Sequence, residues 1–157
     1  MLGDMIVQAA IFDLDEVLVL TRRYHLKAWK QLCRRHGWSE VVANGEEKET
    51  LNMILRENGV TAGEKERKEL LSEKQRYYEE VLSEMESEDF FPGAIGFVIE
   101  LRAHEVLTAI AASSAGARRI VESLDMGELF DAIVFAEELE MDGPTPELYR
   151  TTAEELG

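Results

Sequence analysis

Two aspartates at the end of an apolar run carry the strongest chemical signal in the sequence. Asp13 and Asp15 are one residue apart and directly follow residues 6–12, IVQAAIF. If residues 6–12 form a strand, the two side chains point the same way. Crowded carboxylates can split their pKa values or share a cation, so one could attack phosphorus while the other moves protons. The alternative is an Asp-rich turn that caps a helix. Because only seven of the 32 acidic residues are Asp, we favour a functional site.

Three short apolar runs predict the sheet that positions these aspartates. Residues 6–12, 106–112 and 130–136 are typical of buried strands, and residues 93–103, 116–124 and 146–156 have helical patterns. Alternating apolar strands and helices predict a parallel sheet covered on both faces. Ligands bind at the carboxyl edge of such sheets, where Asp13 and Asp15 would lie.

The segment between the first two predicted strands contains helical patterns only. Apolar residues recur at three- and four-residue spacing in residues 22–36, 46–58 and 63–86. A helical block inside a strand–helix–strand pattern indicates an inserted cap. We therefore predict an α/β fold: a partial Rossmann-like core of three parallel strands, formed by residues 1–18 and 91–157, with an all-helical cap at 19–90.

Composition restricts the classes of function. The chain has 157 residues, 45% of them hydrophobic, and a formal net charge of −15. The charge makes nucleic acid or an anionic membrane an unfavourable partner. No apolar run reaches the ~20 residues that span a bilayer, and residues 1–8 do not read as a secretory signal. The single cysteine, Cys33, excludes an internal disulfide and favours a reducing, cytoplasmic location.

Two stretches resemble a known enzyme family. IFDLDEVLVLTRRYHLKAW and the segment from FFPGAIGF to the end are similar to the haloacid dehalogenase-like phosphohydrolases, in particular the β-phosphoglucomutase-like subgroup with a helical cap. The resemblance implies Mg²⁺, bound by Asp13 and Asp15, and a small phosphorylated metabolite as substrate. It makes Asp13 the nucleophile and Asp15 the general acid/base. Thr21 and His25 would lie at the hinge, and Lys74 would reach the substrate phosphate from the cap.

The sequence departs from the family pattern at several positions. Glu16 replaces a glycine, and Gly143 stands where the family has a lysine before proline. Ala112 takes the place of a phosphate-binding Ser or Thr, so that role would pass to Ser113 or Ser114 directly behind it. Arg118 or Arg119 could supply positive charge, although such pairs are more often solvated.

The sequence also stops before the family's later acidic residues that hold Mg²⁺, so we expect weak metal binding and impaired phosphohydrolase or phosphomutase activity. The alternative is a non-catalytic relative, or a truncated or altered form, that keeps the fold as a binding or structural module. The free edge of the first strand predicts a covering element: a second copy in a homo-oligomer, a partner chain, or residues 1–5.

Overall fold

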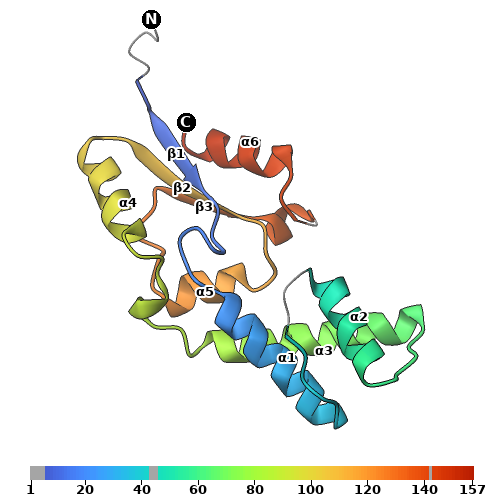
Figure 1. Cartoon of the computed structure of the whole chain (residues 1–157). Helices are drawn as coiled ribbons and strands as arrows, with labels where there is room; N and C mark the ends of the chain where they lie inside the picture. The colour runs from blue at the N-terminus through green and yellow to red at the C-terminus, as the bar shows by residue number, and fades with distance from the viewer. Residues whose placement is uncertain (1–5, 43–45, 142) are drawn as a thin grey trace, which may run out of the picture. The chain divides into compact units, whose positions relative to one another are not determined.

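The chain forms two compact units in a computed structural model that describes residues 6–42, 46–141 and 143–157. One unit is built from the chain up to Thr21 together with Glu84–Gly157, and the other is Arg22–Ser83. Figure 1 shows the strands in the first unit and only helices in the second. The predicted fold class, a parallel α/β core with an all-helical insertion, is confirmed.

The sheet has three parallel strands in the order β1-β2-β3. These are β1 (Ala9–Phe12), β2 (Leu107–Ala112) and β3 (Ala132–Phe135). Ala9 lies opposite Leu107, and Ala112 lies opposite Phe135. Because the strands are parallel, the loops that follow them leave from one edge of the sheet, the edge that carries Asp13.

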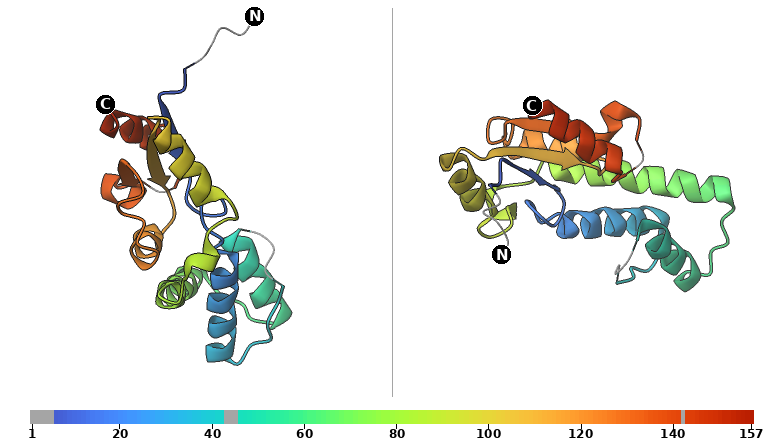
Figure 2. Two further views of the ribbon diagram at one scale, coloured as in Figure 1. Left: turned by 90° about the vertical axis from the view of Figure 1, so that its left-hand side faces the viewer. Right: turned by 90° about the horizontal axis from the view of Figure 1, so that it is seen from above.

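Helices cover both faces of the sheet. Helix α4 (Ala94–Ala103) lies on one face and α6 (Pro146–Glu155) on the other (Figures 1 and 2). Helix α5 (Ala117–Ser123) links β2 to β3, and two 3₁₀ turns, η1 (Ser87–Asp89) and η2 (Ala136–Leu139), complete the unit. The central strand is buried from Thr108 to Ala112, as expected for a strand covered on both sides.

Apolar residues form the contact between the sheet and α6. Ala111, Val134, Ala136 and Leu148 form a buried cluster, against which Ile11 packs. Thr145 caps α6 by accepting a hydrogen bond from the Leu148 amide at 3.2 Å, and Pro146 occupies the first turn, so the predicted helix entry is confirmed.

The second unit consists of α1 (Arg22–His36), α2 (Glu47–Glu57) and α3 (Glu64–Leu82). Helix α1 packs against α3 (Figure 1). Four aromatic side chains are buried inside this unit: Tyr24, Trp29, Tyr77 and Tyr78. Cys33 is also buried, and burial is the main cause that raises the pKa of its thiol. No described helix is both long and apolar enough to cross a bilayer.

Most elements are shorter than predicted, and β1, α3 and β3 by the most; β3 covers only Ala132–Phe135 of the predicted 130–136. Strand β1 starts at Ala9 because β2 begins opposite it, which leaves Ile6 83% and Val7 54% exposed. In the described sheet β1 pairs only with β2, so it is half-buried rather than fully buried. The proposed cover of this edge by residues 1–5 falls outside the described residues. Helix α3 ends at Leu82, where Ser83 Oγ donates to the Glu80 carbonyl at 2.8 Å and competes with helical hydrogen bonding.

Candidate functional site

The loop after β1 is a compact turn that fixes both aspartates. Leu14, Leu18 and Val19 are buried, so the apolar side chains anchor the loop from inside. The Glu16 amide donates to the Val19 carbonyl at 2.7 Å, and the Leu18 amide donates to Leu14 at 3.0 Å. Asp13 and Asp15 alternate with these anchors and are half-buried.

Asp15 is joined to the loop after the neighbouring strand. Ser114 Oγ donates a short hydrogen bond to Asp15 Oδ2. The other oxygen, Asp15 Oδ1, is buried and has no hydrogen-bond partner among the described residues. Asp13 Oδ1 accepts a hydrogen bond from the Leu14 amide at 2.7 Å. Of the candidate residues, the structure thus brings Ser114 to Asp15, and Ser113 is half-buried in the same loop.

The backbone conformation of Glu16 explains why the family pattern has a glycine at this position. Its φ is +57°, in the left-handed region that favours glycine. Its side chain has a structural partner, because Glu16 Oε1 accepts from the Thr21 amide at 2.8 Å and from Thr21 Oγ1 at 3.3 Å. Thr21, predicted to lie at the hinge, is buried and bound to this carboxylate.

The aspartate loop offers a minimal set of ligands for Mg²⁺. The described residues contain no cluster of three or more His, Cys, Asp or Glu side chains suited to a metal. Mg²⁺ is commonly held by one or two carboxylates together with substrate phosphate and water. Asp13 fits that role through its side chain and Asp15 through its backbone carbonyl, which leaves the buried, unpartnered side-chain oxygen of Asp15 for proton transfer.

A cation lies beside the carboxyl end of β3. Arg118, in α5, donates from Nε to Glu137 at 3.2 Å and from an Nη nitrogen to Glu138 in a short contact. Its guanidinium lies over the Phe135 ring, with Cζ 4.3 Å from the ring centroid. Phe135 is the last residue of β3, and the two glutamates follow it in η2.

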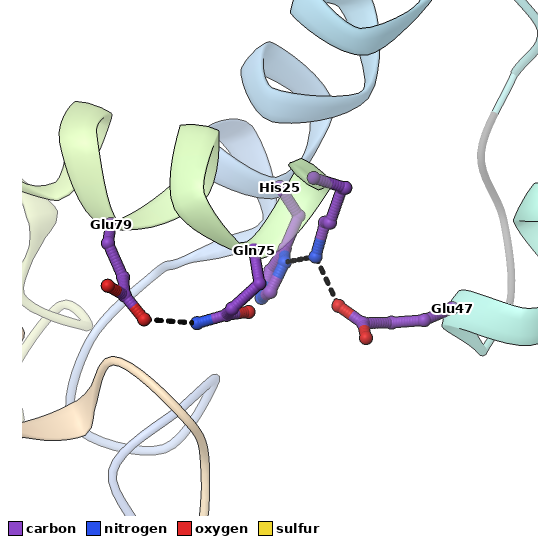
Figure 3. Close-up of polar contacts among 5 residues, drawn as sticks. His25, Glu47, Gln75 and Glu79 are labelled. Atoms are coloured by element: carbon purple, nitrogen blue, oxygen red, sulfur yellow. Dashed lines mark hydrogen bonds and ion pairs between the residues drawn. The ribbon is translucent and has the colours of Figure 1, made fainter. Parts of the chain in front are cut away.

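The second unit contains a lysine whose side chain is fully buried. The Lys74 amine lies between His25 and Glu47 (Figure 3). Lys74 Nζ is 2.9 Å from His25 Nδ1 and forms a short ion pair with Glu47 Oε1. A lysine ammonium only donates, so His25 accepts at Nδ1. Gln75 and Glu79 form a neighbouring hydrogen bond of 3.0 Å (Figure 3).

Aromatic rings enclose this lysine. Its Nζ is 5.3 Å from the Trp29 ring centroid and 5.1 Å from that of Tyr78. Tyr78 also stacks on His25 at 3.9 Å. Desolvation lowers the pKa of Lys74 below its usual range, and the Glu47 carboxylate partly opposes that change. The structure therefore joins His25 and Lys74, the two candidate residues of this unit.

Sequence patterns did not predict the partners of two candidate residues, Lys74 and Thr21. Glu47 pairs with Lys74 from another helix, 27 positions away. Glu16 caps the Thr21 amide across a tight turn. Spacing identifies neighbours along one helix or strand, but neither pair lies on a single regular element.

Comparison with known proteins shows which family the chain is similar to. Residues 10–157 match the sequence family described as haloacid dehalogenase-like hydrolase. The chain is 30% identical to β-phosphoglucomutase of Bacillus subtilis over 155 residues, which cover 94% of this chain and 69% of that protein. It is 24% identical to a phosphorylated carbohydrates phosphatase of Thermotoga maritima, covering 96% of this chain and 71% of the relative.

A solved structure supports the same assignment. The crystal structure of β-phosphoglucomutase from Clostridium difficile superposes with a TM-score of 0.68 at 26% identity, covering 96% of this chain and 71% of the other. The fold and the sequence match thus agree. The chain belongs to the haloacid dehalogenase-like hydrolases, in the β-phosphoglucomutase-like subgroup.

Proposed function

We propose that this protein is a Mg²⁺-dependent phosphohydrolase of small phosphorylated metabolites that works slowly. The observation that carries the proposal is the Asp15 carboxylate, held by Ser114 at the sheet's carboxyl edge with one buried oxygen unpartnered. A carboxylate kept at such a site without a second partner suits proton transfer or metal binding. The relatives named as a phosphoglucomutase and a carbohydrate phosphatase support a phosphorylated sugar as the substrate class.

In the proposed reaction Asp13 acts as the nucleophile. A carboxylate oxygen of Asp13 attacks phosphorus, and the bond from phosphorus to the ester oxygen breaks. Protonated Asp15 gives its proton to the departing alkoxide. Ionised Asp15 then takes a proton from water, which attacks the aspartyl phosphate, releases inorganic phosphate and regenerates Asp13. Bound Mg²⁺ would reduce the repulsion between the Asp13 carboxylate and the phosphate.

The slow rate follows from the residues around the aspartates. Ala112 ends β2 and offers no hydroxyl, so Ser114 supplies the nearby one, and that hydroxyl already donates to Asp15. The loss of one preorganised donor commonly lowers a rate by about 10²–10³-fold. We therefore expect turnover that is measurable but well below that of an efficient phosphatase.

A second candidate function, a non-catalytic binding module, is favoured by one contact. The Lys74 charge is already neutralised by Glu47, so this amine has less capacity to attract a phosphate. A protein of this kind would keep the fold as a binding or structural module and would not hydrolyse a phosphate ester.

Hydrolysis of p-nitrophenyl phosphate tests the proposal. Wild type, Asp13→Asn and, as a matched control on an exposed turn, Asp125→Asn are compared with Mg²⁺ and with EDTA. We expect Mg²⁺-dependent turnover in the wild type and in the control, and none in Asp13→Asn. Equal rates for the wild type and Asp13→Asn would refute the catalytic proposal and leave the binding module.

A further inference from the structure

The helical unit contains a cavity formed by its own residues. Its volume is about 280 Å³, and its described lining residues all belong to Arg22–Ser83. They come from the end of α1, the loops on either side of α2, and α3, and Val60, Ala62 and Leu70 give the lining an apolar part. Small-molecule sites typically measure ~300–1,000 Å³, so this cavity suits a ligand group about the size of one long side chain.

Hydrogen bonds hold the walls of this cavity in place. The Trp38 amide donates to the Cys33 carbonyl at 2.8 Å, which fixes the loop after α1. The Ser39 amide donates to Asn58 Oδ1 at 2.7 Å, and Asn58 Nδ2 donates to the Ser39 carbonyl at 3.1 Å. The loop before α2 is thus tied to the end of that helix. Because the walls are already ordered, a ligand pays little to organise them.

An aromatic ring forms one wall of the cavity. Trp38 is half-buried and stacks on His36, with ring centroids 4.5 Å apart and planes 22° apart. His36 lies with Nε2 2.9 Å from Glu73 Oε2, and the Tyr77 hydroxyl donates to Glu73 Oε1 at 2.7 Å. Glu73 therefore orients the imidazole, and the imidazole supports the indole.

Carboxylates give the cavity a negative charge. Glu66, Glu69 and Glu73 line it at three- and four-residue spacing along α3. Glu66 Oε2 accepts from the Gly63 amide at 2.7 Å. Glu69 pairs with Lys65 across 3.9 Å, and the two side chains are 65% and 90% exposed, so this pair neutralises little charge. Even with the neighbouring histidine protonated, three carboxylates outnumber the positive groups beside them.

A lining that is aromatic, apolar and acidic fits an organic cation. The face of an indole attracts cations, and carboxylates form their strongest hydrogen bonds with charged donors. Within the described parts of the chain, no cluster of His, Cys, Asp or Glu side chains is suited to a metal ion. A guanidinium is more weakly hydrated than an ammonium, stacks on aromatic rings and donates in a planar fork that matches a carboxylate.

We propose that this cavity binds the guanidinium group of a small ligand, which contacts the Trp38 ring and donates to Glu69. The site goes beyond the proposed phosphohydrolase function and does not depend on it.

A titration with N-acetyl-arginine amide, followed by NMR of the indole N–H signals, tests the proposal. The chain has two tryptophans, and Trp38→Phe assigns their signals. We expect the Trp38 signal to shift saturably and the Trp29 signal to stay in place, because Trp29 does not line the cavity. N-acetyl-citrulline amide, which keeps the shape of the probe without its charge, should not bind.

Glu69→Gln tests the carboxylate in the full chain. Glu64→Gln is the matched control, because it removes the same charge from an exposed position of the same helix outside the cavity lining. We expect Glu69→Gln to weaken binding about fivefold, the upper end for an exposed ion pair, and Glu64→Gln to match the wild type. The proposal is overturned if the arginine compound leaves the Trp38 signal unshifted, if the citrulline compound shifts it equally, or if the two glutamate variants bind equally.

Discussion

Removing the charge of Glu47 should destabilise the helical unit more than removing the buried lysine that it neutralises. Lys74 has no exposed surface, whereas the Glu47 side chain is 49% exposed. In Glu47→Gln the ammonium stays buried without its counter-charge. In Lys74→Met the remaining carboxylate can return to water, and a Met side chain can fill the space beside Trp29 and Tyr78.

The burial of each partner determines how much each substitution should change the free energy of unfolding. Losing one partner of a fully buried pair costs about 3–5 kcal/mol, and exposed pairs contribute about 0–1 kcal/mol. Because one partner here is half-exposed, we expect Glu47→Gln to lower the free energy of unfolding by about 2 kcal/mol. We expect Lys74→Met to change it by about 1 kcal/mol or less, since relief of the desolvation cost offsets the lost contacts.

Urea unfolding followed by tryptophan fluorescence measures this difference. Both tryptophans, Trp29 and Trp38, lie in the helical unit and report on it alone. Glu64→Gln and Lys68→Met provide the matched controls, because that pair lies on α3 with side chains 86% and 75% exposed. Each control should change stability by less than about 0.5 kcal/mol. If Lys74→Met costs as much as Glu47→Gln, the account of the buried charge is wrong.

The pH dependence provides a second check on the same lysine. Burial lowers the pKa of Lys74 in the folded protein below its ordinary value of 10.5. Between the two pKa values the unfolded chain binds more protons, so this group makes stability rise as pH increases toward 10.5. The contribution should be present in Lys68→Met and absent in Lys74→Met. A rise of equal size in both variants would contradict this assignment.

Three further predictions concern the strand unit. Asp131→Ala should lower the free energy of unfolding by about 2 kcal/mol, because Asp131 accepts from the Thr108 amide and pairs with Arg102. These contacts, the amide bond first, lower the pKa of Asp131, so their contribution should disappear as pH falls through that pKa. Glu16→Gly should be about 1 kcal/mol more stable than Glu16→Ala, since only glycine relieves the left-handed backbone. Ser114→Ala should lower kcat for p-nitrophenyl phosphate about tenfold by freeing Asp15, and Ser114→Thr should restore it.

Chemical unfolding followed by circular dichroism gives the stabilities, with the exposed-helix variant Glu122→Gln as the control for Asp131→Ala. An acid dependence that Asp131→Ala leaves unaltered would argue against the second part of the first prediction. Equal stability of Glu16→Gly and Glu16→Ala would show that the backbone at this residue is not strained. A kcat for Ser114→Ala equal to that of the wild type would mean that its hydroxyl does not position Asp15.

Local patterns in the sequence predicted most elements of the fold. The apolar runs before Asp13 and around Ile110 and Val134 predicted the three strands, because period and residue type are local properties. The entry of α6 was equally local, since Thr145 and Pro146 act on the backbone beside them. Strand ends were less predictable. Strand β1 starts at Ala9, opposite the first residue of β2, and not where its own apolar run begins.

The sequence by itself determined where the two candidate carboxylates lie, Asp13 and Asp15 directly after the first strand. Only the tertiary structure decided their partners and those of the charged side chains around them. Ser114 lies 99 positions from Asp15, and Glu47 neutralises a lysine on another helix. Such pairs form because packing brings distant elements within a few ångströms, and neither periodicity nor local spacing carries that information.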